Sequence, residues 1–226
     1  MAVHPHRSSS TPRPPQLARR AEPVLRPADE YDLDEGPHLD GLDLSGLDLG
    51  GRDLDDHVFE ECDLSRAQLD GASLVGAEFI DTRLAEATAT MLHAPRSTWR
   101  RTEVTRSRIG AAELYEGAWK STSVTGCKVG YLNLRGARLE DVEFRDCVFD
   151  DLDLLDARLE RVAFHGCRVT TLTVRGASMK DVDLRGLDLG GIDDPSALRG
   201  ATVTSEQLWE LAPLLASHLG IGVLES

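Results

Sequence analysis

The chain of 226 residues carries 39 acidic and 25 basic side chains, which gives a formal net charge of −14 at pH 7. This balance argues against ordinary binding to nucleic acid or to an anionic membrane, because both reward an excess of Lys and Arg. No apolar run approaches the roughly 18 residues that a spanning helix needs, and the N-terminus lacks an apolar signal segment. We therefore expect no membrane span and a cytoplasmic location.

Residues 1–30 differ in composition from the rest of the chain, because proline, serine and arginine are frequent and few residues could form a core. Such a composition is typical of a disordered tail with solvated side chains. The arginines of this segment, among them Arg13, Arg19 and Arg20, could instead contact an acidic partner. The sequence predicts a flexible leader over residues 1–30.

Residues 37–191 keep a period of five without a slip. Every fifth residue from Leu39 to Leu189 is apolar, and a column of small residues runs two positions earlier in each unit. This second column includes all four cysteines, which we expect to be buried, unpaired thiols: Cys62, Cys127, Cys147 and Cys167. A period of five fits neither a helix nor a plain strand, so the apolar positions share one interior only if the chain turns a corner in every unit.

A second period, of 20 residues, sets how many corners make one turn. The segment LNLRGARLEDVEFRDCVFDD, from Leu132, aligns with LDLLDARLERVAFHGCRVTT, from Leu152. Four units per turn predict a square coil in which residues 20 positions apart stack at the strand spacing of about 4.8 Å. The sequence thus predicts an all-β fold over residues 31–194, a quadrilateral parallel β-helix of about eight coils. Tyr31 and Leu33 are expected to plug its open N-terminal end.

The repeat units themselves resemble a known family. LDLSG from Leu42, LDLGG from Leu47 and ARLED from Ala137 are similar to the A(D/N)LXX unit of pentapeptide-repeat proteins. The resemblance implies that the β-helix is right-handed. It also implies a candidate function, since family members of the quinolone-resistance group mimic the shape and charge of duplex DNA and bind DNA gyrase. An antibiotic-resistance role, with gyrase as the partner and no direct contact to nucleic acid, follows from the resemblance.

The repeat weakens between Ala85 and Arg108 although its register continues. Pro95 cannot donate a ladder hydrogen bond, so it predicts a distorted corner or a bulging loop. The same segment contains five arginines, which we call the basic waist: Arg96, Arg100, Arg101, Arg106 and Arg108. They could bind an acidic surface or a phosphate, or they could lie on different corners of the coil and form no single patch.

Two polar residues interrupt the column of small interior residues in the first coils. Arg52 and His57 could mark a polar site at the N-terminal end, because a buried arginine is otherwise unfavourable. Alternatively, Arg52 bends outward and His57 finds a backbone partner.

Residues 195–226 follow a different pattern after the register breaks at Asp193-Asp194-Pro195. Thr204 and Gln207 form a capping-box pattern, which predicts the start of a short helical cap. Pro213 is expected to kink or split the helix. Trp209 lies off the apolar stripe, so one side could cover the last coil while the other joins a second chain as a homodimer. The candidate cap and dimer residues are Leu208, Trp209, Leu211 and Leu215.

The sequence contains no nucleophile elbow, phosphate loop or zinc-type Cys/His cluster. We therefore expect no enzymatic activity, no cofactor and no metal. What the pattern predicts instead is a rigid rod with charged outer faces.

One face of this rod is more acidic than the others. We call it the Leu54 face, after the first of the units that stack on it, and its acidic candidates are Asp53, Asp55, Asp56, Glu113, Glu116, Asp153 and Asp156. Arg96, Arg135 and Arg175 oppose them on the same face. A DNA mimic would use such carboxylates in place of phosphates. The alternative is an acidic scaffold that binds another protein and has no relation to gyrase.

Overall fold

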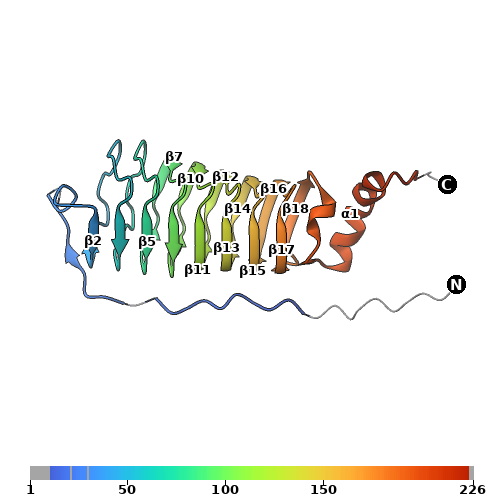
Figure 1. Cartoon of the computed structure of the whole chain (residues 1–226), viewed down its shortest axis with the longest axis horizontal. Helices are drawn as coiled ribbons and strands as arrows, with labels where there is room; N and C mark the ends of the chain where they lie inside the picture. The colour runs from blue at the N-terminus through green and yellow to red at the C-terminus, as the bar shows by residue number, and fades with distance from the viewer. Residues whose placement is uncertain (1–10, 21, 30, 224–226) are drawn as a thin grey trace.

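The computed structural model describes residues 11–20, 22–29 and 31–223. These residues form a parallel β-solenoid of about nine stacked turns, followed by one C-terminal helix (Figure 1). The predicted quadrilateral parallel β-helix with a helical cap is confirmed, with about nine turns where the sequence predicts about eight. No helix within the described part of the chain is long and apolar enough to cross a membrane.

Two large sheets make up the walls. An 11-stranded sheet covers the faces centred on Leu39 and Leu44, and a six-stranded sheet covers the face centred on Leu49. The first sheet contains β2 (His38–Asp40), β4 (Val58–Glu60), β5 (Glu78–Ile80), β6 (Arg83–Ala85), β8 (Thr98–Arg100), β9 (Glu103–Thr105), β11 (Ala118–Thr125), β13 (Arg138–Arg145), β15 (Arg158–His165), β17 (Ser178–Asp183) and β19 (Ala201–Thr202). The second contains β7 (Thr88–His93), β10 (Arg108–Glu113), β12 (Lys128–Asn133), β14 (Val148–Asp153), β16 (Cys167–Thr173) and β18 (Leu187–Ile192).

The register of stacking is 20 residues, as the sequence predicts. Phe59 pairs with Phe79 and Phe79 with Trp99, and the rings stack with centroid distances of 5.1 and 4.2 Å. The central residues of successive units fill one continuous core, in which Phe144, Phe149 and Phe164 are almost fully buried. The four cysteines are buried and unpaired. Burial raises the pKa of the Cys62 thiol to about 11.

Pro95 does not disturb the coil, contrary to expectation. The register is continuous on both sides of it, since Ser73 bridges to His93 and Phe79 pairs with Trp99. At the equivalent position of other units on the same face, the backbone N–H of Leu155 bonds to the unit's own aspartate, Asp153, rather than to the ladder. Proline therefore removes a donor that the parallel ladder does not use.

The structure places the predicted N-terminal plug residues and the two polar residues of the interior column as follows. Leu33 is buried beneath the first coil, whereas Tyr31 is 77% exposed and plays no part in the plug. Arg52 reaches outward to Asp34, at 3.4 Å, and His57 Nδ1 lies 3.1 Å from the carbonyl of Asp55. Neither residue forms a polar site in the core.

Residues 11–20 and 22–29 lie along the outside of the solenoid, and we call them the N-terminal strap. Their path runs from the α1 end towards the β2 end, opposite to the order of the coils (Figure 1). At the far end, β1 (Arg26–Pro27) pairs in parallel with β3 (Leu42–Asp43). This path differs from the flexible tail that composition predicts. Residues 1–10, 21 and 30 of that predicted tail lie outside the described residues.

The C-terminal segment closes the other end of the solenoid. The 3₁₀ helix η1 (Pro195–Leu198) interrupts the repeat, and β19 then pairs with β17 at an offset of 19 residues rather than 20. Helix α1 (Ser205–His218) begins with the predicted capping box of Thr204 and Gln207. It continues through Pro213 as a single helix rather than splitting there.

Candidate functional site

The aspartate of the repeat unit has a structural role that bears on every candidate acidic residue. Its carboxylate accepts a hydrogen bond from the backbone N–H two residues later, as Asp63 does from Ser65 at 2.8 Å. The same contact recurs on several faces, at Asp43, Asp48, Asp53, Asp153 and Asp183. Such a local turn satisfies a backbone donor that the ladder leaves free. These carboxylates therefore stabilise turns of the solenoid, whether or not they also contact a partner.

Asp153 is the extreme case, because it is buried rather than exposed as the sequence suggests. Only 4% of the residue is accessible, and its carboxylate contacts Arg135 Nε at 2.6 Å and Tyr131 Oη at 3.3 Å. Burial, followed by the nearby charge of Asp153, raises the pKa of the Tyr131 phenol. Asp153 is paired with Arg135 and buried, so it cannot contact a partner directly.

Asp53, Asp55 and Asp56 lie together in the first coil of the Leu54 face and are exposed. The carboxylate of Asp55 is held by the next coil, where it accepts from Ser73 Oγ at 2.6 Å and from the Val75 N–H at 2.9 Å. These three residues form the acidic cluster nearest to the N-terminal end.

Glu113, Glu116 and Asp156 have different surroundings although they lie close together in the stack. Glu113 Oε2 is 2.8 Å from His93 Nδ1 and is half-buried, whereas Glu116 and Asp156 are exposed. Glu116 and Asp156 line an open groove of about 390 Å³ together with Arg135. The structure thus divides the acidic candidates into two exposed clusters and two internally paired residues.

The exposed carboxylates at the corner of the Leu54 face share one environment. Asp56, Glu116 and Asp156 each have a glycine 20 residues later, in the next coil. A Cβ built on Gly76 would lie 2.3 Å from Asp56 Oδ1, and one built on Gly176 would lie 2.0 Å from Asp156 Oδ1. The absent side chain leaves room for the carboxylate to lie over the backbone of the next coil.

The basic waist is not one patch. Arg96, Arg101 and Arg106 turn three different corners, while Arg100 and Arg108 lie on strands β8 and β10 of different sheets. Arg101 pairs with Asp81 at 2.5 Å and Arg106 with Glu86 at 2.9 Å, in each case across one coil. The hydrogen bond to Asp81 raises the pKa of Arg101. The structure therefore separates the waist arginines and pairs two of them.

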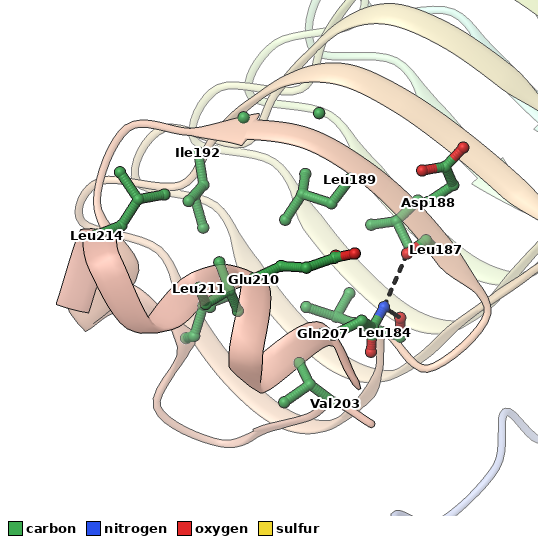
Figure 2. A pocket seen from close by; sticks show the side chains of 13 residues that line it. Leu184, Leu187, Asp188, Leu189, Ile192, Val203, Gln207, Glu210, Leu211 and Leu214 are labelled. Carbon is green, nitrogen blue, oxygen red and sulfur yellow. Dashed lines mark hydrogen bonds between the residues drawn. The ribbon is translucent and has the colours of Figure 1, made fainter. Parts of the chain in front are cut away.

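Helix α1 covers the end of the solenoid only in part. Leu211 is buried and Leu215 half-buried, and Gln207 Nε2 donates to the carbonyls of Leu184 and Leu187 at 2.7 Å each (Figure 2). A pocket of about 250 Å³ remains between α1 and β18. On the outer side Trp209 is 80% and Leu208 51% exposed. The sequence pattern identified these residues but did not reveal the anchoring role of the Gln207 amide.

Within the described residues no group of three or more His, Cys, Asp or Glu side chains is arranged to hold a metal ion.

Comparison with known proteins identifies the repeat and the fold. The family model for pentapeptide repeats, in eight copies, matches residues 43–81, 62–91 and 132–170. None of the curated proteins matches the sequence significantly. The chain is similar to a trypsin-treated variant of QnrB1, a plasmid-mediated fluoroquinolone resistance protein, at 17% identity. This likeness has a TM-score of 0.52 and covers 83% of this chain and 97% of that chain.

A second structural neighbour is HetL, a pentapeptide repeat protein involved in heterocyst differentiation regulation from the cyanobacterium Nostoc sp. strain PCC 7120. It is 19% identical, with a TM-score of 0.34, over 83% of this chain and 92% of that chain. At 17% identity, the likeness to QnrB1 concerns the fold alone. In its repeat sequence and its fold, this chain is similar to pentapeptide-repeat proteins.

Proposed function

We propose that the protein is a non-enzymatic rod that binds a protein partner through the acidic Leu54 face, with DNA gyrase as the specific candidate. The observation that carries the proposal is the row of exposed carboxylates at one corner, Asp56, Glu116 and Asp156. None of the three forms an ion pair within the described part of the chain, whereas Glu113 contacts His93 and Asp153 contacts Arg135. Each can therefore present its full negative charge to a cationic surface.

The row holds its carboxylates at fixed distances along the rod. Asp56 and Glu116 are three coils apart, about 14 Å, and Glu116 and Asp156 are two coils apart, about 10 Å. A rigid solenoid holds these distances fixed, which favours recognition by a surface that normally binds duplex DNA. Arg96 occupies the same corner between Asp56 and Glu116, so the partner must accommodate one positive charge there.

A charge-only variant tests the proposal. In Asp56→Asn, Glu116→Gln and Asp156→Asn combined, the shape of each side chain is kept, and Asn tolerates the left-handed backbone of these corners. Purified gyrase is assayed for supercoiling with and without a quinolone. Wild-type protein is expected to change the activity or the drug response, and the triple variant to lose at least about tenfold in potency. The wild-type effect should also weaken steeply as salt is raised.

The matched control removes the same charge from another part of the surface. Asp146, Asp150 and Asp151 are exposed and lie at a different corner and on the Leu49 face, so their combined change to Asn should leave the effect intact. Equal loss in both variants would reject the Leu54 face. A wild-type protein without effect in either condition would favour the alternative, an acidic scaffold for a partner unrelated to gyrase. Asp153 contacts Arg135 and Glu113 contacts His93, so neither carboxylate is free on the acidic face. This interruption of the face supports the scaffold alternative.

We also infer that two copies of the chain associate through α1. Trp209 and Leu208 lie on the outer side of the helix and are largely exposed, while Leu211 holds the inner side to the solenoid. An exposed apolar surface of this kind is typical of an interface, and a twofold contact between identical helices would cover it on both chains.

A further inference from the structure

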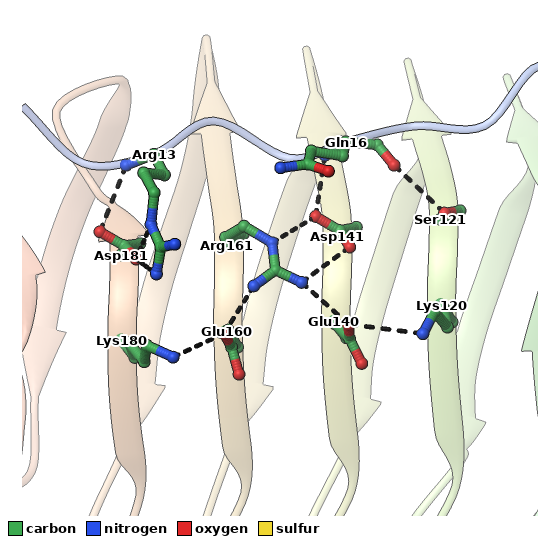
Figure 3. A network of polar contacts seen from close by, with 10 residues as sticks. All are labelled: Arg13, Gln16, Lys120, Ser121, Glu140, Asp141, Glu160, Arg161, Lys180 and Asp181. Atoms are coloured by element: carbon green, nitrogen blue, oxygen red, sulfur yellow. Dashed lines mark hydrogen bonds and ion pairs between the residues drawn. The ribbon is translucent and has the colours of Figure 1, made fainter.

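The N-terminal strap lies on one corner of the solenoid, which we call the first corner. It joins the Leu39 and Leu44 faces, and its residues are Gly41, Glu61, Asp81, Arg101, Ser121, Asp141, Arg161 and Asp181, all with positive φ. Arg13 contacts Asp181, and Gln16 contacts Asp141 and Ser121 (Figure 3). Residues that are 105 to 168 positions apart in the sequence thus meet along this corner.

The length of the strap fits the length of the corner. From Arg13, at Asp181, to Arg26, whose N–H donates to Gly41, the strap passes along seven 20-residue coils, about 34 Å. Thirteen residues in a polyproline II conformation would span about 40 Å. The prolines at positions 12, 14 and 15 favour that extended conformation before any contact is made. Pro12 is buried against the solenoid.

The first corner recognises both the backbone and one side chain of the strap. The N–H of Gln16 donates to Asp141 Oδ1 at 2.8 Å, and its carbonyl accepts from Ser121 Oγ at 3.2 Å. Because both contacts are to backbone atoms, they bind an extended segment whatever its side chains are. Arg13 adds a charge-specific contact, because its Nε and Nη2 lie 2.8 and 2.7 Å from Asp181 Oδ2. The preferred occupant is therefore an extended polypeptide with an arginine three residues before the backbone contact.

The recognising carboxylate is held in place by the solenoid itself. Arg161, whose side chain is only 11% exposed, donates to both oxygens of Asp141 at 2.7 and 2.9 Å. The same guanidinium contacts Glu140 at 2.9 Å and Glu160 at 2.5 Å. Asp141 therefore keeps its orientation with or without the strap, as a preformed binding surface requires. The guanidinium of Arg161 and the N–H of Gln16 hold the pKa of Asp141 below its ordinary value.

The two ends of the strap are held with different strength. The β1 end is fixed by ladder hydrogen bonds from the N–H groups of Arg26 and Ala28, both at 2.9 Å. Towards the other end, Leu17 and Arg19 are exposed, and Arg20 meets Glu103 only at 3.6 Å. The Arg20 side chain is largely buried, but Arg13 is 59% exposed in its ion pair with Asp181, and such a surface pair contributes little and is screened by salt. Residues 11–20 are therefore tethered at their base and weakly bound along their length.

We propose that the first corner is a docking surface for an extended, arginine- and proline-containing polypeptide segment, which residues 11–20 occupy as a displaceable internal ligand. A partner protein that offers a segment of the same chemistry binds by replacing Arg13 at Asp181 and Gln16 at Asp141. The strap then remains attached through β1. The first corner is separated by the Leu39 face from the corner of Asp56, Glu116 and Asp156 and uses none of those carboxylates, so the proposal does not rest on gyrase binding.

The test uses the full chain and a fluorescent peptide with the sequence of residues 11–20, TPRPPQLARR, titrated at low salt and followed by anisotropy. In the Arg13→Ala protein the internal ligand is weakened, so the peptide should bind at least about fivefold more tightly than to wild type. The Arg19→Ala protein carries the same charge change at an exposed residue and should behave as wild type. The Asp181→Asn change should weaken binding of the peptide to the Arg13→Ala protein at least about fivefold.

Three results would overturn the proposal. One is equal peptide affinity of the Arg13→Ala and Arg19→Ala proteins, and another is no binding to either at millimolar peptide. The third is self-association of wild type that Arg13→Ala abolishes, since the strap would then dock on a second copy and not within one chain. Circular dichroism of each variant checks that the solenoid is intact.

Discussion

Asp153 and Asp156 lie three residues apart in one repeat unit, yet one is buried and the other exposed. Both occupy positions that the five-residue pattern assigns to the outside. The difference arises in the preceding coil, where Tyr131 and Arg135 fold over Asp153, while Gly136 leaves that corner open. Since the difference depends on residues about 20 positions away, a unit read by itself cannot show it.

Replacement of Asp153 by Ala should destabilise the protein. The change leaves the Leu155 N–H and the Arg135 guanidinium without their acceptor, and loss of such a buried partner costs about 1 to 3 kcal/mol. Asp150 is exposed and provides the control, since its change to Ala should alter stability by less than about 0.5 kcal/mol. Urea unfolding of both variants measures the difference, and equal midpoints would show that the buried acceptor contributes nothing.

The contribution of Asp141 to stability should depend on pH. Its pKa is lowered in the folded protein, chiefly by Arg161, so the unfolded chain binds a proton more readily. The stabilisation is therefore fully present above the ordinary carboxyl pKa of about 4 and is lost as pH falls through the lower folded value. Thermal unfolding should show wild type above Asp141→Asn at pH 7, with the gap narrowing below about pH 4. A gap that stays constant down to pH 2 would contradict this linkage.

At the scale of single elements, the strands β7, β9, β10 and β11 enclose a gap in the core. An apolar cavity of about 50 Å³ lies among residues that include Leu92, Val104, Ile109 and Trp119. It forms where the central residues change from Leu to smaller side chains, and Val104 is only half-buried although it occupies a central position. The smaller central residues thus weaken the sequence pattern and leave a cavity, while the register continues.

Filling this cavity should stabilise the solenoid. Val104→Leu restores the residue type found at Leu64 and Leu84 on the same face, and cavity filling commonly adds about 0.5 to 2 kcal/mol. Val174→Leu is the matched control, because Val174 is fully buried away from the cavity and overpacking there should cost about 1 to 3 kcal/mol. Melting temperatures of the two variants should move in opposite directions. A lower melting temperature for Val104→Leu would mean that the cavity cannot accept another methylene.

Helix α1 is the element through which we expect two chains to associate. Truncation after Thr204 removes Trp209 and Leu208, so sedimentation should report a monomer, whereas the full chain should have the mass of a dimer. The milder change Trp209→Ser keeps Leu211 in place against the solenoid and should shift the equilibrium in the same direction. A truncated chain that still sediments as a dimer would assign the interface to another element.

At the scale of the whole molecule, the fold could be predicted because each repeat contributes the same information. The positions of Leu39, Phe59 and Phe79 define the register before any contact is known, and Thr204 with Gln207 defines the start of α1. The strap could not be predicted in the same way. Its contacts at Asp181 and Asp141 depend on a corner that exists only after the coils have stacked, and its composition alone is typical of a disordered segment.

The stacked architecture predicts that damage to the core stays local. Phe144→Ala should cost about 3 to 5 kcal/mol, because Trp119, Phe149 and Phe164 cannot close around the space. Each coil contacts only its neighbours, so hydrogen exchange should accelerate first in β11, β13 and β15. Uniform acceleration from β2 to β18 would instead indicate a single cooperative unit.

The square cross-section also constrains how the length of this protein can change. Insertion of 20 residues adds one full turn and leaves every later side chain on its own face. Loss of a single unit between Gly76 and Glu116 would rotate the rest of the rod by a quarter turn. Glu116 and Asp156 would then point at right angles to Asp56, and the strap would meet a different series of side chains beyond that point. Variation in length can preserve both surfaces only in steps of whole turns.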